Sequence, residues 1–286
     1  MTTKLKVAHS PDSDDAFMFY AIKEHKIDLY DLDFEFSSAE IAILNQELLN
    51  GNPRADIMAA SFHTYALIKN DYALLDSGMS FANKDHGPKI VCKNPNLTKD
   101  DLSRIKIAVP GKNTTAFLVL KEIIRHAACS ERSVAITHND NFTFCEFDKV
   151  FDLLESGKVD AALLIHEAQL KYQDYGYKLL VDLGAWWHEH TDGLDLPLGC
   201  NVASKKLGPE LIKQVDEILS ESISWGQKNF QEVMDYSRAF ANNGLDDARA
   251  KQYLETYVLK SCTPTKKQEC IDKILALVTS SMPSLM

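Results

Sequence analysis

The sequence predicts an α/β protein of two lobes, each a mixed, mostly parallel sheet flanked by helices, with a cleft between the lobes. A strand–loop–helix pattern that occurs twice and a helical C-terminal region are the observations behind this prediction. The length of 286 residues also exceeds what one hydrophobic core usually supports. We therefore expect two lobes of related structure.

The first repeated pattern begins at Leu5 and again at Ile105. The two segments read LKVAHSPDSDDAFMFYAIKE and IKIAVPGKNTTAFLVLKEII. Each opens with a short apolar run, passes through Pro, Gly, Ser or Asn residues typical of turns, and continues with apolar residues at helical spacing. The chain therefore predicts one βα unit that is used twice.

A second pair of segments follows in the same order. ELLNGNPRADIMAASFHTYA and DLLESGKVDAALLIHEAQLKY each predict a helix, a glycine stop and a buried parallel strand. Gly51 corresponds to Gly157, and Asp56 corresponds to Asp160. A duplicated lobe explains both pairs, and a chance likeness between βα units is the alternative.

The chain is expected to cross between the lobes at two segments, GPKIVCKNPNLTKDDL and DLPLGCNVASKKLGPEL, each of which carries a short strand beside Pro or Gly residues. Lobe one then comprises residues 1–92 plus 201–286, and lobe two comprises residues 93–200. Beyond Pro209 the pattern predicts helices almost to the end, which complete lobe one. Ligands of open α/β sheets bind at the carboxyl ends of the strands, so the loops there should face the cleft.

Composition excludes several classes of partner. The net charge is −10, and no dense run of Lys or Arg suits a phosphate backbone, so we expect no nucleic acid. No apolar stretch reaches the roughly 18 residues of a membrane span. The start MTTKLKVAHSPDS lacks the features of a secretory signal, which predicts a cytoplasmic protein.

The cysteines predict reduced thiols rather than a metal site. None of them forms a CxxC pair, so we expect no structural zinc or iron–sulfur cluster. They are Cys92, Cys129, Cys145, Cys200, Cys262 and Cys270.

The loop GKNTT at residues 111–115 joins a predicted strand to a helix. Its hydroxyls and backbone N–H groups can hold an anion at the helix N-terminus. Asn113, Thr114 and Thr115 are therefore candidates for substrate binding. The alternative is that Asn113 or Thr114 only caps the helix, and both roles can coexist.

The corresponding loop of lobe one, HSPDSDD, carries three carboxylates after residue 9. They can hold hydroxyl groups of a polar ligand or simply cap the helix that follows. Asp15 and Ser10 are the candidates for substrate contact here. Magnesium is only weakly indicated, and we predict no metal.

His166 follows directly on an apolar strand, at the end that should open on the cleft. Imidazole titrates in the range that suits a general base, so His166 is the candidate catalytic residue. A histidine that only caps the next helix is the competing interpretation. Ser61 ends the matching strand of lobe one and can donate a hydrogen bond to substrate.

The run AWWHEH at residues 185–190 places two histidines two positions apart. On a strand they would share one face, which raises the hypothesis of a metal site. Adjacent tryptophans more simply cover a pocket wall, and we favour that interpretation.

Five strings in order resemble the 1,4-dihydroxy-6-naphthoate synthases of the futalosine route to menaquinone. They are SPDSDDAFMFYAI, VPGKNTTA, GKVDAALLIHEAQLKY, VDLGAWW and DLPLGCNVASKKLG, spanning residues near 5 to 207. This family is in turn related to the type II periplasmic-binding-protein fold. The resemblance implies that fold for the two lobes.

The resemblance also implies a carbon–carbon lyase that converts cyclic dehypoxanthinyl futalosine into 1,4-dihydroxy-6-naphthoate without metal or organic cofactor. His166 matches the family's proton-abstracting residue. Thr114 and Thr115 match its substrate-binding threonine pair. Ala59, Ala60 and Ser61 match a second substrate-contacting stretch. The expected partner is a small carboxylated molecule, and a homodimer remains open.

The chain departs from the family in lobe one. Many relatives carry Cys-Pro-Asn-Asp-Thr-Phe at residues 12–17, where this chain has DSDDAF, and a basic residue at Ala59. Two alternatives therefore stay open. One is chorismate dehydratase of the same pathway, against which the IHEAQL segment argues. The other is a non-catalytic protein that binds a small carboxylate.

Overall fold

The structure is a computed structural model that describes residues 2–130, 141–240, 246–259 and 264–281. The chain divides into two compact units. The first is drawn from Met1–Phe81 and Pro197–Met286, and the second from Ala82–Leu196. Because the chain leaves the first unit and returns to it, two connections link the units.

The first unit is built on a mixed sheet with strand order β2-β1-β3-β11-β4, to which β5 adds beside β11. β1 pairs in parallel with β2 and β3, whereas β11 runs antiparallel to β3 and β4. The strands are β1 (Thr3–His9), β2 (Leu32–Ser38), β3 (Ile57–Ser61), β4 (Tyr72–Leu74), β5 (Ser80–Ala82) and β11 (Leu196–Ser204).

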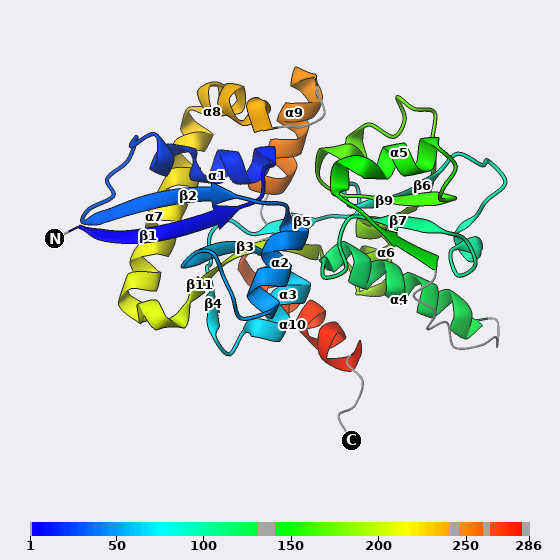
Figure 1. The fold of residues 1–286 in the computed structure, drawn as a ribbon, viewed down its shortest axis with the longest axis horizontal. Coiled ribbons are helices and arrows are strands. Elements are labelled where there is room, and N and C mark those ends of the chain that lie inside the picture. Colours follow the sequence, from blue (N-terminus) through cyan, green and yellow to red (C-terminus); the bar gives the residue numbers. More distant parts are fainter. Residues whose placement is uncertain (1, 131–140, 241–245, 260–263, 282–286) are drawn as a thin grey trace. The chain divides into compact units, whose positions relative to one another are not determined.

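Helices cover both faces of this sheet. The steps from β1 to β2 and from β2 to β3 run in opposite directions, so right-handed crossovers place α1 and α2 on opposite faces, as Figure 1 shows. α1 packs against α7 and α8, and α3 packs against α2 and α10. The helices are α1 (Ser13–Lys23), α2 (Ile41–Leu49), α3 (Phe62–Ile68), η5 (Lys205–Leu207), α7 (Pro209–Lys228), α8 (Phe230–Ser237), η6 (Arg238–Phe240), α9 (Asp247–Leu254), the π-helical turn η7 (Glu255–Leu259) and α10 (Pro264–Ser281).

The second unit repeats this plan with strand order β10-β6-β9-β7-β8. β7 is parallel to β8 and β9, while β6 is antiparallel to β9 and β10. The strands are β6 (Lys89–Cys92), β7 (Ile107–Val109), β8 (Phe142–Phe144), β9 (Ala161–Leu164) and β10 (Lys178–Asp182). The helices are η1 (Lys99–Asp101), α4 (Thr115–Ser130), η3 (Phe147–Lys149), α5 (Val150–Glu155), η4 (His166–Leu170) and α6 (Leu183–His190).

Corresponding positions of the two units make the same contacts. The backbone N–H of Lys6 donates to Asp56 Oδ2 at 2.8 Å, and that of Lys106 donates to Asp160 Oδ2 at 2.8 Å. In the first unit the bond joins Lys6 of β1 to the residue just before β3, and in the second unit it joins the residue just before β7 to the residue just before β9. The topology and these bonds support the duplication that the sequence predicts.

Glycines end the two corresponding helices. Gly51 after α2 has φ of 68°, and Gly157 after α5 has φ of 69°. Both lie in the left-handed region that favours glycine, because a Cβ atom there crowds the backbone. The prediction that a glycine ends each of these helices is confirmed at both positions.

The boundaries between the units need correction. The strand Lys89–Cys92, assigned to lobe one from the sequence, pairs with β9 and β10 in the second sheet. The first unit therefore ends at Phe81 and resumes at Pro197. Pro and Gly residues mark where the chain turns, but they carry no information on which sheet the next strand joins.

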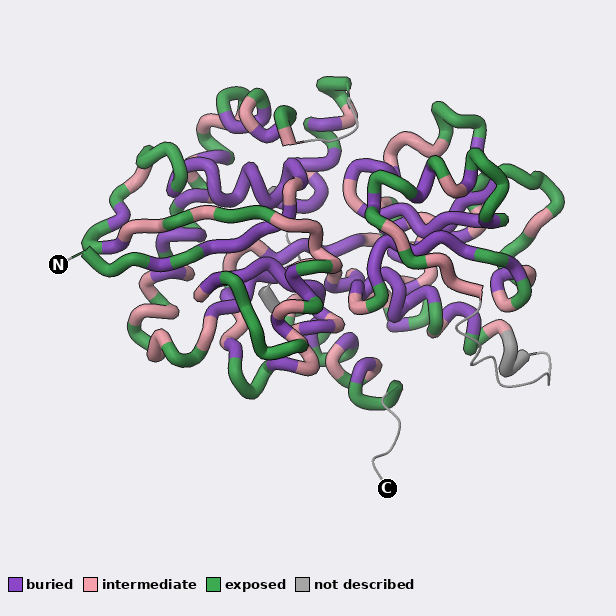
Figure 2. Tube along the Cα trace, in the orientation of Figure 1, coloured by how far each residue is buried: buried purple, intermediate pink, exposed green. Residues whose placement is uncertain are grey.

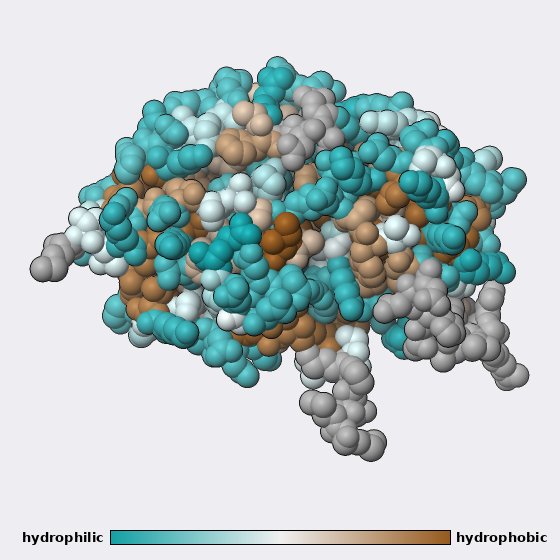
Figure 3. All heavy atoms as spheres, in the orientation of Figure 1, coloured by the Kyte–Doolittle hydropathy of each residue, from teal (hydrophilic) through white to brown (hydrophobic). Residues whose placement is uncertain are grey.

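Each unit has its own apolar core. Leu5, Phe17 and Leu219 belong to the core of the first unit, and Ala108 and Leu154 to that of the second. The inner strands β3 and β9 are buried and the edge strand β2 is mostly exposed or partly exposed, as Figure 2 shows, whereas the face drawn in Figure 3 is mostly hydrophilic. Among the described helices, none combines the length and the apolar character that crossing a membrane requires.

Candidate active site

Two sequence-predicted groups of the second unit leave its sheet at the same edge. β7 and β9 are parallel neighbours, with Ile107 opposite Ala161 and Ala108 opposite Ala162. The chain leaves β7 into the loop at residues 110–114 and leaves β9 toward His166. The topology thus places the predicted anion loop and the predicted base at the carboxyl ends of adjacent strands.

Thr114 is buried and caps helix α4. Its Oγ1 accepts a hydrogen bond from the backbone N–H of Phe117 at 3.2 Å and donates to the carbonyl of Gly111 at 3.1 Å. The capping role considered from the sequence is therefore present. Thr115 is also buried, and Asn113 is partly exposed beside them.

Two lysines give the start of α4 a positive potential. Lys112 lies in the loop, and Lys121 Nζ lies 5.0 Å from the centre of the Phe117 ring. Desolvation, together with the nearby charge of Lys112, lowers the pKa of Lys121. This mutual repulsion of cations, added to the positive end of the helix dipole, favours an anion at this edge.

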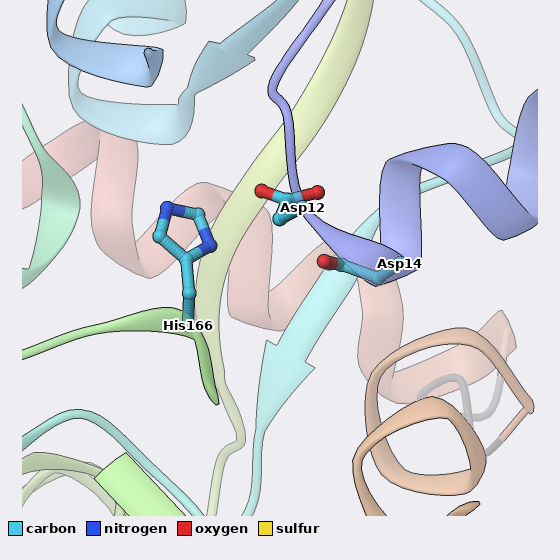
Figure 4. Close-up of side chains that lie close together, drawn as sticks. All are labelled: Asp12, Asp14 and His166. Atoms are coloured by element: carbon cyan, nitrogen blue, oxygen red, sulfur yellow. The ribbon is translucent and has the colours of Figure 1, made fainter. Parts of the chain in front are cut away.

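His166 begins the 3₁₀ helix η4 with φ of 50°, in the left-handed region that non-glycine residues seldom adopt. Its side chain is drawn in Figure 4. The His166 ring meets the buried Phe147 ring edge to face, with the centres 5.3 Å apart. Such backbone strain is concentrated at functional sites, where the surrounding structure holds it.

In the first unit, the ends of two parallel strands again share one edge. β1 ends at His9, and its parallel neighbour β3 ends at Ser61. The loop that follows His9 enters α1, whose N-cap is Asp12; Asp12 Oδ1 accepts from the Asp15 N–H at 3.1 Å. Asp15 Oδ2 in turn accepts from the Ser10 N–H at 2.7 Å. The two predicted contact residues Ser10 and Asp15 are thus held together.

The three carboxylates of this loop are buried and have structural partners. Asp12 caps α1, and Asp15 bonds to Ser10. Asp14, in the first turn of α1 (Figure 4), accepts a hydrogen bond at 3.1 Å from the Tyr253 hydroxyl of α9. Capping, the alternative raised by the sequence, therefore accounts for part of this acidic loop.

The predicted stretch Ala59, Ala60 and Ser61 lies within β3, and all three residues are buried. The side chain of Asn45 bonds to both the hydroxyl and the backbone of Ser61. Asn45 Nδ2 donates to Ser61 Oγ, and Asn45 Oδ1 accepts from the Ser61 N–H, each at 2.9 Å. Ser61 Oγ accepts one bond in this pair, which leaves its proton for an acceptor.

The AWWHEH run is helical rather than extended, so the expectation that its histidines share one strand face is wrong. It forms most of α6, where residues two positions apart point in different directions. His190 Nδ1 bonds to the carbonyl of Trp186 at 2.7 Å, and its ring stacks on Trp186. Asp182 caps the helix through the backbone N–H groups of Gly184 and Ala185, which explains why a helix starts here.

The cysteines whose side chains the structure describes are thiols that form no disulfide with one another. These are Cys92, Cys145, Cys200 and Cys270. Burial raises the pKa of Cys200, and the charge of Asp15 raises it further, so this thiol resists ionisation. The side chain of Cys129 and the whole of Cys262 lie outside the described residues.

Sequence reasoning missed three residues that contact these loops. Asn45 and Tyr253 act on residues far away in the chain, and no local pattern signals such contacts. His9 was quoted within its loop but received no role, although it is the histidine that ends β1 just as His166 follows β9. That correspondence was the available signal.

The fold defines the class first. The structure resembles the periplasmic aliphatic sulphonate binding protein SsuA from Escherichia coli, with a TM-score of 0.67 at 12% identity over 98% of this chain and 88% of the other. It resembles a crystal structure of a protein from Archaeoglobus fulgidus more strongly, with a TM-score of 0.82 at 33% identity over 97% of both chains. The chain is therefore an α/β protein of the periplasmic-binding-protein fold.

The family follows from the sequence comparisons. A family described as "Menaquinone biosynthesis" matches residues 5–271. The chain is 32% identical to a 1,4-dihydroxy-6-naphthoate synthase of Thermus thermophilus over 254 residues, covering 89% of this chain and 85% of the relative. A protein of the same name from Streptomyces coelicolor is 29% identical over 255 residues, covering 89% and 84%. The chain belongs to this menaquinone biosynthesis family and is an enzyme of that route.

Proposed function

We propose that this enzyme is a carbon–carbon lyase that converts cyclic dehypoxanthinyl futalosine into 1,4-dihydroxy-6-naphthoate. The names of its curated relatives support this activity. The single structural observation that carries the proposal is the position of His166. It sits in a strained conformation at the carboxyl end of β9, the parallel neighbour of β7, whose own carboxyl end leads into α4. The proposed base and the proposed anion-binding N-terminus of α4 therefore follow adjacent strands at the same edge of the sheet.

In this proposal the second unit holds the substrate carboxylate. Backbone N–H groups at the start of α4, with Asn113, Thr114 and Thr115, bind the carboxylate oxygens, and the Lys112 and Lys121 charges attract them. To donate to the carboxylate, the Thr114 hydroxyl turns its proton away from the Gly111 carbonyl and keeps its bond from the Phe117 N–H. Binding of the carboxylate orients the ring of the substrate relative to His166. Such positioning converts binding energy into a lower barrier.

His166 removes a proton from the bound substrate as a general base. Its edge-to-face contact with Phe147 and its start-of-helix backbone hold the ring in one orientation. A base that is held in place contributes typically about 10²–10⁴-fold to rate. No metal or organic cofactor is required in this proposal.

The first unit contributes polar contacts to the remainder of the substrate. Ser61, oriented by Asn45, donates its hydroxyl proton, and Ser10 and Asp15 bind hydroxyl groups. Ala59 and Ala60 are buried within β3. In this proposal their small side chains let the substrate approach the end of the strand closely. We also place the enzyme in the cytoplasm, without a nucleic-acid partner; the thiol state of the described cysteines supports this location.

The experiment is an assay of the purified, chelator-treated wild-type protein with cyclic dehypoxanthinyl futalosine, followed by mass spectrometry. We expect 1,4-dihydroxy-6-naphthoate to form at a rate that added Mg²⁺ or Zn²⁺ does not raise. A parallel incubation with chorismate should leave chorismate unchanged. Turnover of chorismate instead, or binding of either compound without turnover, would contradict the proposed reaction.

A further inference from the structure

His9 is a buried histidine at the carboxyl edge of the first sheet for which the proposed mechanism has no use. It ends β1 and is only 5% exposed. Its ring stacks on Phe19 of α1, with the centres 5.5 Å apart, and meets Phe36 of β2 edge to face at 6.1 Å. A phenylalanine would pack equally well between these rings. The ring nitrogens therefore need a separate explanation.

The hydrogen bond of His9 defines which nitrogen carries the proton. Nδ1 lies 2.8 Å from the backbone carbonyl oxygen of Ser10. A carbonyl oxygen can only accept, so Nδ1 must donate. In the neutral ring Nε2 then carries a lone pair and acts as a hydrogen-bond acceptor.

The surroundings favour the neutral ring. Burial lowers the pKa of His9 below its ordinary value of 6.5. The charge of Lys23 acts in the same direction, whereas the hydrogen bond to Ser10 and the charge of Asp12 act against it. These are the charged groups that α1 and its preceding loop present to the ring; β2 presents Phe36.

A second polar atom lies next to His9 in the chain. Ser10 is 2% exposed, and among the described residues its Oγ has no hydrogen-bond partner. A buried hydroxyl without a partner is destabilising, so such an atom indicates a ligand or a bound water. The acceptor of His9 and the hydroxyl of Ser10 suit a ligand that carries hydroxyl groups, which both donate and accept. A ligand carboxylate would be repelled by the acidic residues that follow.

We propose that His9 is a further substrate-binding residue, whose Nε2 accepts a hydrogen bond from a substrate hydroxyl while Ser10 Oγ bonds to an oxygen of the same molecule. This inference rests on the proposed function, because it requires a hydroxyl-bearing substrate. It assigns recognition of substrate hydroxyl groups to the loop after β1, within the first unit. His9 thus determines specificity for the hydroxylated part.

The test compares His9→Phe, which keeps the ring packing, with His9→Gln, which keeps an acceptor near the Nε2 position. We expect His9→Phe to raise KM for cyclic dehypoxanthinyl futalosine about tenfold and to change kcat by less than about twofold, the size and pattern of one lost hydrogen bond to bound substrate. His9→Gln should stay within about threefold of wild type. The exposed His25, changed to Gln, is the matched control and should leave KM unchanged.

Nitrogen-15 NMR of the wild-type protein supplies a readout that needs no variant. At pH 7 the His9 ring should show a protonated Nδ1 and an unprotonated Nε2. An imidazolium ring or the opposite tautomer would overturn the inference, as would unchanged KM in a folded His9→Phe protein or an equal defect in His9→Gln. Those results leave wild-type turnover intact, whereas absence of wild-type turnover overturns the proposed function and this inference together.

Discussion

Thr114 combines a structural task with a proposed binding task, and the two can be separated. Its hydroxyl caps α4 through the Phe117 N–H, and this cap contributes about 1 kcal/mol to the free energy of unfolding. Thr114→Val should remove that contribution and raise KM for the substrate more than it lowers kcat, because a ground-state contact to the carboxylate is weakened. Kinetics and thermal unfolding measure both effects.

Thr114→Ser is the matched control, since it keeps the hydroxyl that bonds to Phe117 and Gly111. It should resemble wild type in both KM and unfolding temperature. If Thr114→Val were destabilised but its KM stayed at the wild-type value, Thr114 would be only a cap and the carboxylate would bind elsewhere.

At the residue scale, the sequence predicts roles that depend on local position. Thr114 and His166 could be selected because each follows a strand at the edge where ligands bind. The hydrogen bonds from Asn45 to Ser61 and from Tyr253 to Asp14 could not be predicted, because they join residues that are 16 and 239 positions apart. The strained φ of His166 was equally invisible, since it depends on how η4 packs.

At the element scale, the start of α6 depends on one carboxylate. Asp182 caps the helix and forms an ion pair with Lys89 of β6, and each of these side chains is 12% exposed. Asp182→Ala removes the cap and leaves a nearly buried ammonium group without its partner. We expect a loss of roughly 3–5 kcal/mol in the free energy of unfolding, measured by chemical denaturation.

Glu189→Ala is the control for this prediction, because Glu189 is exposed on the same helix. It should change the free energy of unfolding by less than about 0.5 kcal/mol. Equal stability of the two variants would show that neither the cap nor the ion pair holds α6 against β6.

The same element shows where element prediction fails. Two tryptophans and two histidines in eight residues have no strong helical pattern, and the hypothesis of a shared histidine face assumed a strand. The cap and the close approach of Gly184, where a Cβ would lie 2.3 Å from the Asn83 carbonyl oxygen, decide for a helix. By contrast, the strongly periodic helices α7 and α10 were predicted correctly.

At the scale of the whole molecule, the duplication was the most informative signal in the sequence. Corresponding glycines and aspartates predicted two related sheets, and the structure has them with matching strand order. The boundaries were misplaced because β6 and β11 each join the sheet that the chain is entering. Strand partners depend on long-range packing, which a local pattern does not contain.

In the proposed function, His166 acts as the base and other residues bind the substrate. Loss of His166 should therefore affect turnover and not binding. His25 is a suitable control, because it too is a non-glycine residue in the left-handed region, with φ of 51° against 50° for His166. His166→Ala and His25→Ala each place alanine at a strained position of the backbone, but only His166→Ala removes the proposed base.

The most direct measurement is therefore the rate of 1,4-dihydroxy-6-naphthoate formation from cyclic dehypoxanthinyl futalosine by wild type, His166→Ala and His25→Ala. The account predicts that wild type and His25→Ala form product at similar rates. It predicts that His166→Ala binds substrate with near-normal affinity but is slower by about 10²–10⁴-fold. A folded His166→Ala enzyme with wild-type turnover would contradict the account.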